Sequence, residues 1–381
     1  ENPHMSSEER RSTSARRRVQ QDPQDLQKAN AAVEKARQGI KKRKKNSFWD
    51  QYSYHIIIGG FIFIIAATLL STLLGKTKKL SLTPVIETDE IEAHNAGHYG
   101  YKLGANSFFQ DQTLADAKKI MNNFFSFKQS LQRCSQMEEQ VILETSYDFR
   151  EQYPQCASPV VDQKNCSSSF AVASASAVSD RLCIQSNQNV RLSAQHYLSC
   201  QEDNEGNECT VGGDIAGYLD FAKRKGVVDE TCFPYKGENG VPCNAEALQR
   251  CQRYFVQDYC IAGGAEGIKK DILQNGPVIG YLPIYRDFLV YKSGVYQVQE
   301  GTSKFQGGHA IKIIGWGQTP EGQQYWIAEN SWGEDWGQKG YAHIAIGQED
   351  LFLDQYAFSV HPRYEREETP ETKEEPEVVK A

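Results

Sequence analysis

An uncharged apolar run at residues 56–74 constrains this chain more than any other feature of its sequence. The run reads IIIGGFIFIIAATLLSTLL, nineteen residues without a charged side chain. As a helix rising 1.5 Å per residue it would span roughly 28 Å, close to the hydrocarbon thickness of a bilayer. A buried core helix is the alternative, but core helices are rarely apolar all round over this length. We therefore predict a single transmembrane helix at 56–74 that contacts the lipid bilayer.

Basic residues flank this run unequally. Three follow it, Lys76, Lys78 and Lys79, and seven precede it: Lys35, Arg37, Lys41, Lys42, Arg43, Lys44 and Lys45. The positive-inside rule then places the N-terminus on the cytosolic or matrix side. The run lies too deep in the chain and is too long for a cleaved signal peptide. We expect a permanent anchor, with the residues after 80 on the opposite face of the membrane.

Composition divides the rest of the chain. The predicted parts are a basic, flexible region at 1–50, a linker at 80–90, a moderately helical segment at 91–145, a large domain at 146–363 and a disordered acidic tail at 364–381. The large domain is helix-rich at first and then strand-rich, with glycine-punctuated turns. Membrane topology accounts for the basic residues of the region 1–50, so no nucleic-acid partner is expected.

All ten cysteines lie between Cys134 and Cys260. No CxxC pair occurs, and the eight histidines are spread along the chain. This pattern excludes zinc-type spacing and favours disulfides formed in an oxidising compartment. No metal or other cofactor is expected.

Three distant positions have the residue types of a nucleophile, a base and an orienting group. The small, apolar stretch beginning at Ser169 predicts a buried helix, with Ser169 at its N-terminus. His309 follows 140 residues later and could take a proton, while the Asn330 amide could hold its ring. Gln163 could donate from its amide to an oxyanion. The remaining alternative, that these residues are unrelated, is hard to reconcile with the motifs around them.

Those motifs resemble the papain family, specifically its cathepsin B branch and the catalytically silent tubulointerstitial nephritis antigens. The residues that carry the resemblance are YDFREQYPQC, the turn from Gln163 to Phe170, SDRLCI, GPVIGYLPIYRDFLVYKSGVYQ, GGHAIKIIGWG and YWIAENSWGEDWGQKGY. More weakly, YKLGANSFFQDQTLADAKKIM resembles the family's inhibitory propeptide. The resemblance implies a two-lobed α+β papain-like fold, with a helical lobe and a β-barrel-like lobe, behind the transmembrane helix.

Roles follow from the resemblance. Gln163 would be the oxyanion residue, His309 the base and Asn330 the orienter, with Ser169 where the nucleophilic cysteine belongs. Gly212, Gly213 and Trp332 would line the substrate groove, although CTV before the glycines has one residue more than the family pattern. The implied disulfides are Cys156–Cys183, Cys166–Cys209, Cys200–Cys243 and Cys232–Cys251. Cys134 and Cys260 remain, either free or tethering the propeptide-like segment to the body.

Serine at position 169 changes the chemistry. A thiol pKa near 8.5 can be lowered enough to form a thiolate–imidazolium pair, whereas a hydroxyl pKa cannot. Serine hydrolases compensate with a buried carboxylate, but Asn330 is neutral. We therefore predict a pseudoenzyme. The alternatives are a weak serine-variant peptidase and an active cysteine protease disabled by an engineered Cys-to-Ser change. Ser167 and Phe170, which also depart from the family pattern, argue against the engineered change.

The predicted function is non-catalytic. We expect a scaffold or accessory subunit of a membrane assembly, bound to other subunits, or a module that binds a peptide in the inactive cleft. The membrane would belong to the secretory pathway or a lysosome-like organelle, or would be the mitochondrial inner membrane with the domain facing the intermembrane space. The Arg- and Ser-rich N-terminus and the lack of a usable glycosylation sequon make the mitochondrial inner membrane a serious second candidate.

Overall fold

The structure is a computed structural model that describes residues 65, 82–121, 132–135, 142–202, 207–299 and 304–363. The chain divides into two compact units, 1–75 and 76–381, and all described residues except Ile65 belong to the second. No helix in this described part has the length and hydropathy to cross a bilayer. The predicted span at 56–74 lies outside it apart from Ile65, and so do the regions 1–50 and 364–381.

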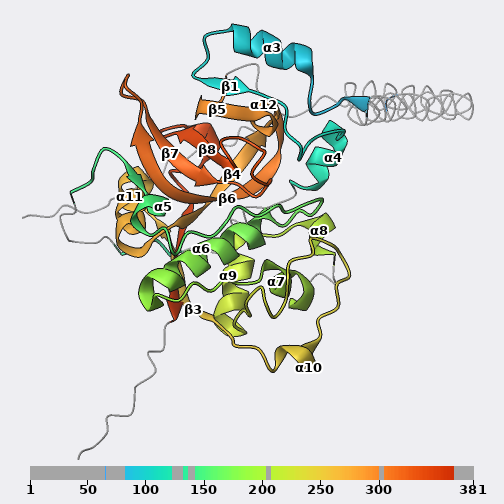
Figure 1. Ribbon diagram of the computed structural model, residues 1–381, viewed down its shortest axis with the longest axis vertical. Coiled ribbons are helices and arrows are strands. Elements are labelled where there is room, and N and C mark those ends of the chain that lie inside the picture. Colours follow the sequence, from blue (N-terminus) through green and yellow to red (C-terminus); the bar gives the residue numbers. More distant parts are fainter. Residues whose placement is uncertain are drawn as a thin grey trace, which may run out of the picture. The chain divides into compact units, whose positions relative to one another are not determined.

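One half of the second unit is a mixed sheet (Figure 1). Its strand order is β1-β5-β8-β7-β6-β4-β9-β3, with β2 paired to β6. Only β5 and β8 run parallel, and the other pairs are antiparallel. The strands are β1 (Tyr101–Leu103), β2 (Tyr147–Asp148), β3 (Phe255–Ala262), β4 (Val278–Tyr285), β5 (Tyr291–Tyr296), β6 (Phe305–Gln318), β7 (Gln324–Glu329), β8 (Tyr341–Ala345) and β9 (Ala357–Arg363). Strand β6 is buried along nearly its whole length, as its run of β-branched residues predicts.

The other half is helical and has its own hydrophobic core. Its principal helices are α6 (Ser169–Ser186), α7 (Ala194–Cys200) and α9 (Ile215–Arg224), and its short ones are α8 (Glu208–Val211) and α10 (Ala245–Leu248). Helix α6 is buried from Ser169 to Cys183, because its alanines and serines let neighbours approach from every side. It ends where Asn187 adopts a left-handed conformation. The predicted α+β class is thereby confirmed.

Smaller elements join the two halves and cover the sheet. They are α3 (Thr88–Ala96), α4 (Leu114–Lys119), α5 (Phe149–Gln152), α11 (Gly264–Asn275), α12 (Arg286–Leu289) and the 3-10 turn η2 (Glu349–Leu351). Helix α3 begins inside the range 80–90, so the predicted linker is helical at its end. Helix α4 starts with a capping box between Thr113 and Asp116, a local signal that stabilises the first turn.

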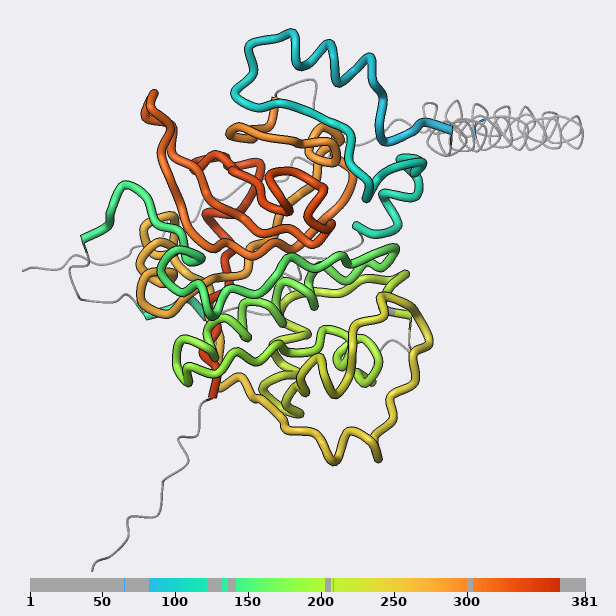
Figure 2. The backbone as a smooth tube through the Cα atoms, in the orientation of Figure 1, coloured from blue at the N-terminus to red at the C-terminus, as the bar shows by residue number. Residues whose placement is uncertain are grey.

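The propeptide-like segment is part of the folded body. We use the name retained segment for the described residues 82–121 and 132–135, which comprise most of the described part of the propeptide-like segment predicted at 91–145 together with the end of the predicted linker (blue to teal in Figure 2). Strand β1 of this segment extends the sheet beside β5. Its side chains Tyr101, Leu103, Phe109 and Leu114 belong to the same hydrophobic core as the β half. The segment therefore contributes to the stability of the domain that it covers.

Candidate active site

Ser169 is the first residue of α6 and is fully buried. Its Oγ accepts a hydrogen bond of 3.0 Å from the backbone N–H of Ala310. Ala310 follows His309 on strand β6, so the fold brings the predicted nucleophile position beside the predicted base. The hydroxyl is engaged by the backbone next to the imidazole.

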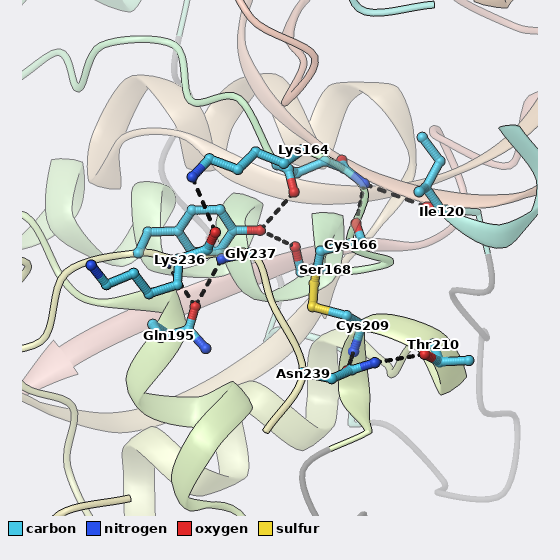
Figure 3. Close-up of a disulfide and its surroundings, with 12 residues drawn as sticks. Ile120, Lys164, Cys166, Ser168, Gln195, Cys209, Thr210, Lys236, Gly237 and Asn239 are labelled. Atoms are coloured by element: carbon cyan, nitrogen blue, oxygen red, sulfur yellow. Dashed lines mark hydrogen bonds between the residues drawn. A yellow bond between two sulfur atoms is a disulfide. The ribbon is translucent and has the colours of Figure 1, made fainter. Parts of the chain in front are cut away.

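The turn that leads into α6 is held by a disulfide and a tyrosine (Figure 3). Cys166 is bonded to Cys209. The Tyr235 hydroxyl donates to the carbonyl of Gln163 at 2.9 Å and lies 2.6 Å from Ser168 Oγ. Burial raises the pKa of Tyr235, so the phenol stays neutral and can donate. These contacts hold the turn without involving the Ser169 side chain.

His309 is fully buried, and its Nε2 lies 2.7 Å from Asn330 Oδ1. The pair matches the predicted base and orienter. His309 Nδ1 and Asn330 Nδ2 have no hydrogen-bond partner among the described residues. Burial lowers the pKa of His309 to about 4, against a smaller opposing effect of Asn330. The imidazole is therefore neutral near pH 7, and no imidazolium is present to stabilise an anionic nucleophile.

Gln163 is also fully buried, and both ends of its amide are engaged. Its Nε2 donates to the Cys166 carbonyl at 2.7 Å and lies 3.4 Å from the Ile120 carbonyl. Its Oε1 accepts from Ser331 Oγ at 2.5 Å. Because Ser331 follows Asn330, the oxyanion position and the orienter position are joined through a single side chain.

The retained segment crosses the site at Ile120 and Met121. The Met121 carbonyl accepts a hydrogen bond of 3.0 Å from the N–H of Gly308, directly before His309. A Cβ at Gly307 would lie 2.5 Å from the same carbonyl oxygen, so glycine is needed there for the segment to approach. Backbone of the retained segment thus contacts the residues on either side of the cleft.

Aromatic side chains extend this contact to Trp332, which is buried. Phe108 stacks on its ring at 5.8 Å between centroids, and Phe109 meets it edge-on at 5.0 Å. Asn106, buried nearby, donates to the carbonyl of Leu289 at 3.0 Å. The predicted groove residue Trp332 is therefore covered by the chain's own retained segment.

The predicted glycines of the groove lie beside the active-site helix. Gly212 has a positive φ of 77°, which favours glycine. A Cβ at Gly213 would lie 2.6 Å from the Phe170 ring. Phe170 replaces the tryptophan of the family pattern, and its ring packs where Gly213 leaves room. Val211, the preceding residue, is exposed.

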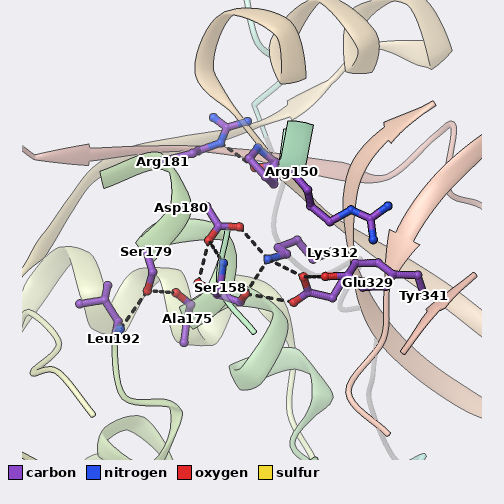
Figure 4. A network of polar contacts seen from close by, with 12 residues as sticks. Arg150, Ser158, Ala175, Ser179, Asp180, Arg181, Leu192, Lys312, Glu329 and Tyr341 are labelled. Carbon is purple, nitrogen blue, oxygen red and sulfur yellow. Dashed lines mark hydrogen bonds and ion pairs between the residues drawn. The ribbon is translucent and has the colours of Figure 1, made fainter. Parts of the chain in front are cut away.

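A second buried polar cluster was not predicted from the sequence (Figure 4). Lys312 Nζ lies 2.6 Å from Asp180 Oδ2, 2.9 Å from Glu329 Oε2 and 2.7 Å from Ser176 Oγ. Burial alone would lower the pKa of Lys312, but the two carboxylates outweigh it and raise the pKa. Burial also raises the pKa of Glu329, against the opposing charge of Lys312. The signal in the sequence is Lys312 itself, a charge within the apolar stretch AIKIIGW of strand β6.

The structure pairs all ten cysteines. The four bridges implied by the resemblance are present: Cys156–Cys183, Cys166–Cys209, Cys200–Cys243 and Cys232–Cys251. Of the two alternatives left open for the remaining cysteines, the tether is the one observed, as a disulfide between Cys134 and Cys260. Five disulfides indicate an oxidising compartment. Among the described residues, no group of three or more His, Cys, Asp or Glu side chains is placed to hold a metal ion.

Comparison with known proteins agrees with this architecture. The family model of papain family cysteine proteases matches residues 143–360. Human tubulointerstitial nephritis antigen-like is 28% identical over 320 residues, which cover 73% of this chain and 68% of that protein. Cathepsin B-like cysteine proteinase 1 of Ostertagia ostertagi is 35% identical over 240 residues, 54% of this chain and 69% of that protein.

A solved structure extends the similarity to the retained segment. Procathepsin B S9 from Trypanosoma congolense superposes with a TM-score of 0.67 at 28% identity, covering 74% of this chain and all of that chain. The proform of the ragweed pollen allergen Amb a 11 has the same fold, with a TM-score of 0.61 at 22% identity. A precursor-type arrangement, with a propeptide-like segment on the domain, is therefore present. The chain belongs to the papain family of cysteine proteases, with cathepsin B-like proteins among its relatives.

Proposed function

We propose that this chain is a catalytically inactive papain-like protein, anchored in a membrane through residues 56–74, that acts as a scaffold or accessory subunit of a membrane assembly. The observation that carries the proposal is the arrangement of Ser169 and His309. Ser169 Oγ accepts from a backbone N–H, while His309 Nδ1 has no partner within the described part of the chain. General-base activation requires a hydrogen bond from the nucleophile to its base, and none joins these two side chains in the described structure.

Two further features support inactivity. The neutral His309 lacks the charge that a papain-type ion pair requires, and Asn330 has no carboxylate with which to stabilise one. The Gln163 amide donates to carbonyls of the chain, so it is not free to bind an oxyanion. Each feature would have to change before acyl transfer could begin.

The covered cleft favours a scaffold over a peptide-binding module. Met121 and Ile120 contact the site through backbone carbonyls, and Phe108 and Phe109 pack on Trp332. An extended peptide would compete with these contacts. The outer surfaces of the domain are then the surfaces available to other subunits.

Labelling of the full-length protein in mild detergent tests the proposal. We expect no reaction of Ser169 with a serine-reactive fluorophosphonate, and stoichiometric co-purification of membrane proteins. Mass spectrometry of the same preparation identifies those partners and the organelle. Labelling of wild-type Ser169 that is lost in His309→Ala would contradict the proposal and favour the weak serine peptidase.

The variant Ser169→Cys distinguishes a naturally inactive protein from a cysteine protease disabled by an engineered Cys-to-Ser change. We expect this variant to hydrolyse no fluorogenic dipeptide substrate, because the retained segment still engages Gln163 and covers Trp332. The double variant Ser169→Cys, His309→Ala is the matched control. Turnover by Ser169→Cys that disappears in the double variant would identify a cysteine protease whose nucleophile had been replaced.

A further inference from the structure

The retained segment is fastened to the domain at the edge of the sheet farthest from β1. Residues 132–134 lie parallel to β3, and Arg133 forms a bridge with Ile261. The N–H of Ile261 donates to Gln132, and the N–H of Cys134 donates to Ile261. Strand β3 is the last in the sheet order and β1 is the first. The segment is thus paired to both ends of the sheet and crosses the cleft between them.

The Cys134–Cys260 disulfide makes the second attachment covalent, across a sequence separation of 126 residues. The polypeptide itself is the other covalent connection, because it continues from the segment to Tyr147 in β2. Near that connection Ile142 is 89% exposed, so a protease can reach the chain there. A single cut at this point would break the peptide connection and leave the disulfide.

The disulfide is also accessible to small reagents. Both sulfur-bearing residues line a cavity of about 640 Å³, and each is only half-buried. Arg133, Lys223 and Lys270 line the same cavity. Cations near a cysteine stabilise its thiolate, which favours that sulfur as the leaving group in exchange.

The surrounding charges, and the burial of the bridge at the active-site turn, distinguish this disulfide from Cys166–Cys209, whereas Cys200–Cys243 and Cys232–Cys251 are also partly exposed. On the acidic side of the cavity, Asp258 is exposed and Asp271 is paired with Arg181 at 2.6 Å. By contrast, the Cys166–Cys209 bridge of the active-site turn is buried. A dithiol reagent therefore meets Cys134–Cys260 before it meets the bridge that shapes the cleft.

We infer that Cys134–Cys260 is a redox latch that keeps the retained segment on the domain after the chain has been cut. It is opened by a protein or small-molecule dithiol. One thiolate of the dithiol attacks a sulfur of the pair, forms a mixed disulfide and releases the other cysteine as a thiolate, which takes up a proton. The second thiol then displaces the remaining cysteine, leaving two cysteine thiols and an oxidised dithiol. Uncovering the cleft requires both the cut and the reduction.

This inference goes beyond the proposed scaffold role, since it holds whether or not Ser169 reacts. The test uses the full-length chain in detergent, with an N-terminal affinity tag and a site-specific protease sequence inserted after Ile142. The tagged N-terminal part is captured, the chain is cut, and the domain left on the resin is measured during washing at about 1 µM protein. A tether provides an effective concentration in the millimolar range, so its loss lowers rebinding about a thousandfold.

We expect the cut, oxidised chain to stay on the resin and the cut double variant Cys134→Ser, Cys260→Ser to wash off. The matched control, Cys200→Ser with Cys243→Ser, removes a bridge within the domain and should be retained like the wild type. Retention of the cut Cys134→Ser, Cys260→Ser variant would overturn the latch, because non-covalent contacts would then suffice.

A second measurement needs no variant. The uncut wild-type protein is treated with limiting dithiothreitol, alkylated and analysed by mass spectrometry. We expect Cys134 and Cys260 to be alkylated before Cys166 and Cys209. Alkylation of the buried pair first, or of all four at one rate, would show that the cavity gives no selective access and would overturn the latch.

Discussion

Two buried polar clusters draw on the same elements, yet they are built in opposite ways. Helix α6 supplies Ser169 to one and Asp180 to the other, and strand β6 supplies His309 and Lys312 in the same order. The residues at the end of β7 complete them, Asn330 in the first cluster and Glu329 in the second. The first cluster carries no charge near pH 7, whereas the second holds an ammonium group between two carboxylates.

The two clusters differ in how many of their polar atoms have hydrogen-bond partners. The ammonium group of Lys312 has three oxygen partners, which matches its three donors, and Asp180 also accepts from Ser158. His309 Nδ1 and Asn330 Nδ2 have none among the described residues. Burying a charge without partners is costly, and in the ionic cluster each charged group has a partner of opposite charge. This cluster joins the two lobes. The unsatisfied atoms of the neutral cluster do not stabilise the fold.

The largest expected effect comes from breaking the charged cluster. In Lys312→Met the carboxylates of Asp180 and Glu329 are left buried without a counter-ion. We expect the free energy of unfolding to fall by about 3–5 kcal/mol, measured by urea titration of tryptophan fluorescence. Lys119→Met is the control, because its pair with Asp116 is exposed and should contribute less than about 1 kcal/mol. Equal losses of unfolding free energy in Lys312→Met and Lys119→Met would contradict the larger contribution assigned to the buried cluster.

The next effect concerns the pH dependence of stability. Burial lowers the pKa of His309 to about 4 from an ordinary value of 6.5. Between these values the unfolded chain binds a proton that the folded chain does not, so stability falls as pH drops from 6.5 to 4. His309 alone should account for about 3 kcal/mol of that loss at pH 4. Unfolding of His309→Gln, measured across this range, should therefore show a shallower decline.

Other histidines whose pKa burial lowers, among them His196 and His343, limit how much of the decline can be assigned to His309. Burial also lowers the pKa of His196 to about 4, so part of the decline should persist in His309→Gln. His98 is exposed, and His98→Gln is the matched control that should follow the wild type. A pH profile of His309→Gln that superimposes on the wild type would show that His309 is not held neutral by burial.

The smallest effect distinguishes two buried serines on one helix. Ser169→Ala removes the acceptor of the Ala310 N–H and should cost about 1–2 kcal/mol. Ser174 is equally buried, but its Oγ has no hydrogen-bond partner in the described part of the chain. We expect Ser174→Ala to be neutral or slightly stabilising in thermal unfolding. A larger loss for Ser174→Ala than for Ser169→Ala would refute the assignment of the Ser169 hydrogen bond.

Local patterns in the sequence were enough to predict much of this molecule. The small side chains after Ser169 predicted the buried helix, because a helix surrounded by neighbours needs small or apolar residues at every position. The β-branched residues after His309 are typical of a strand, and β6 lies there. Residue types, separations and the resemblance of the flanking motifs to the papain family indicated that His309 and Asn330 belong together, and the structure places His309 Nε2 2.7 Å from Asn330 Oδ1.

Contacts between distant parts of the chain were decided only by the tertiary structure. Whether Cys134 and Cys260 are paired, and whether the retained segment covers Trp332, depends on how a chain folds back over more than a hundred residues. No local pattern encodes such a return. Lys312 is a related case: a charge within an apolar strand is visible in the sequence, but its cost depends on partners that only folding brings within reach.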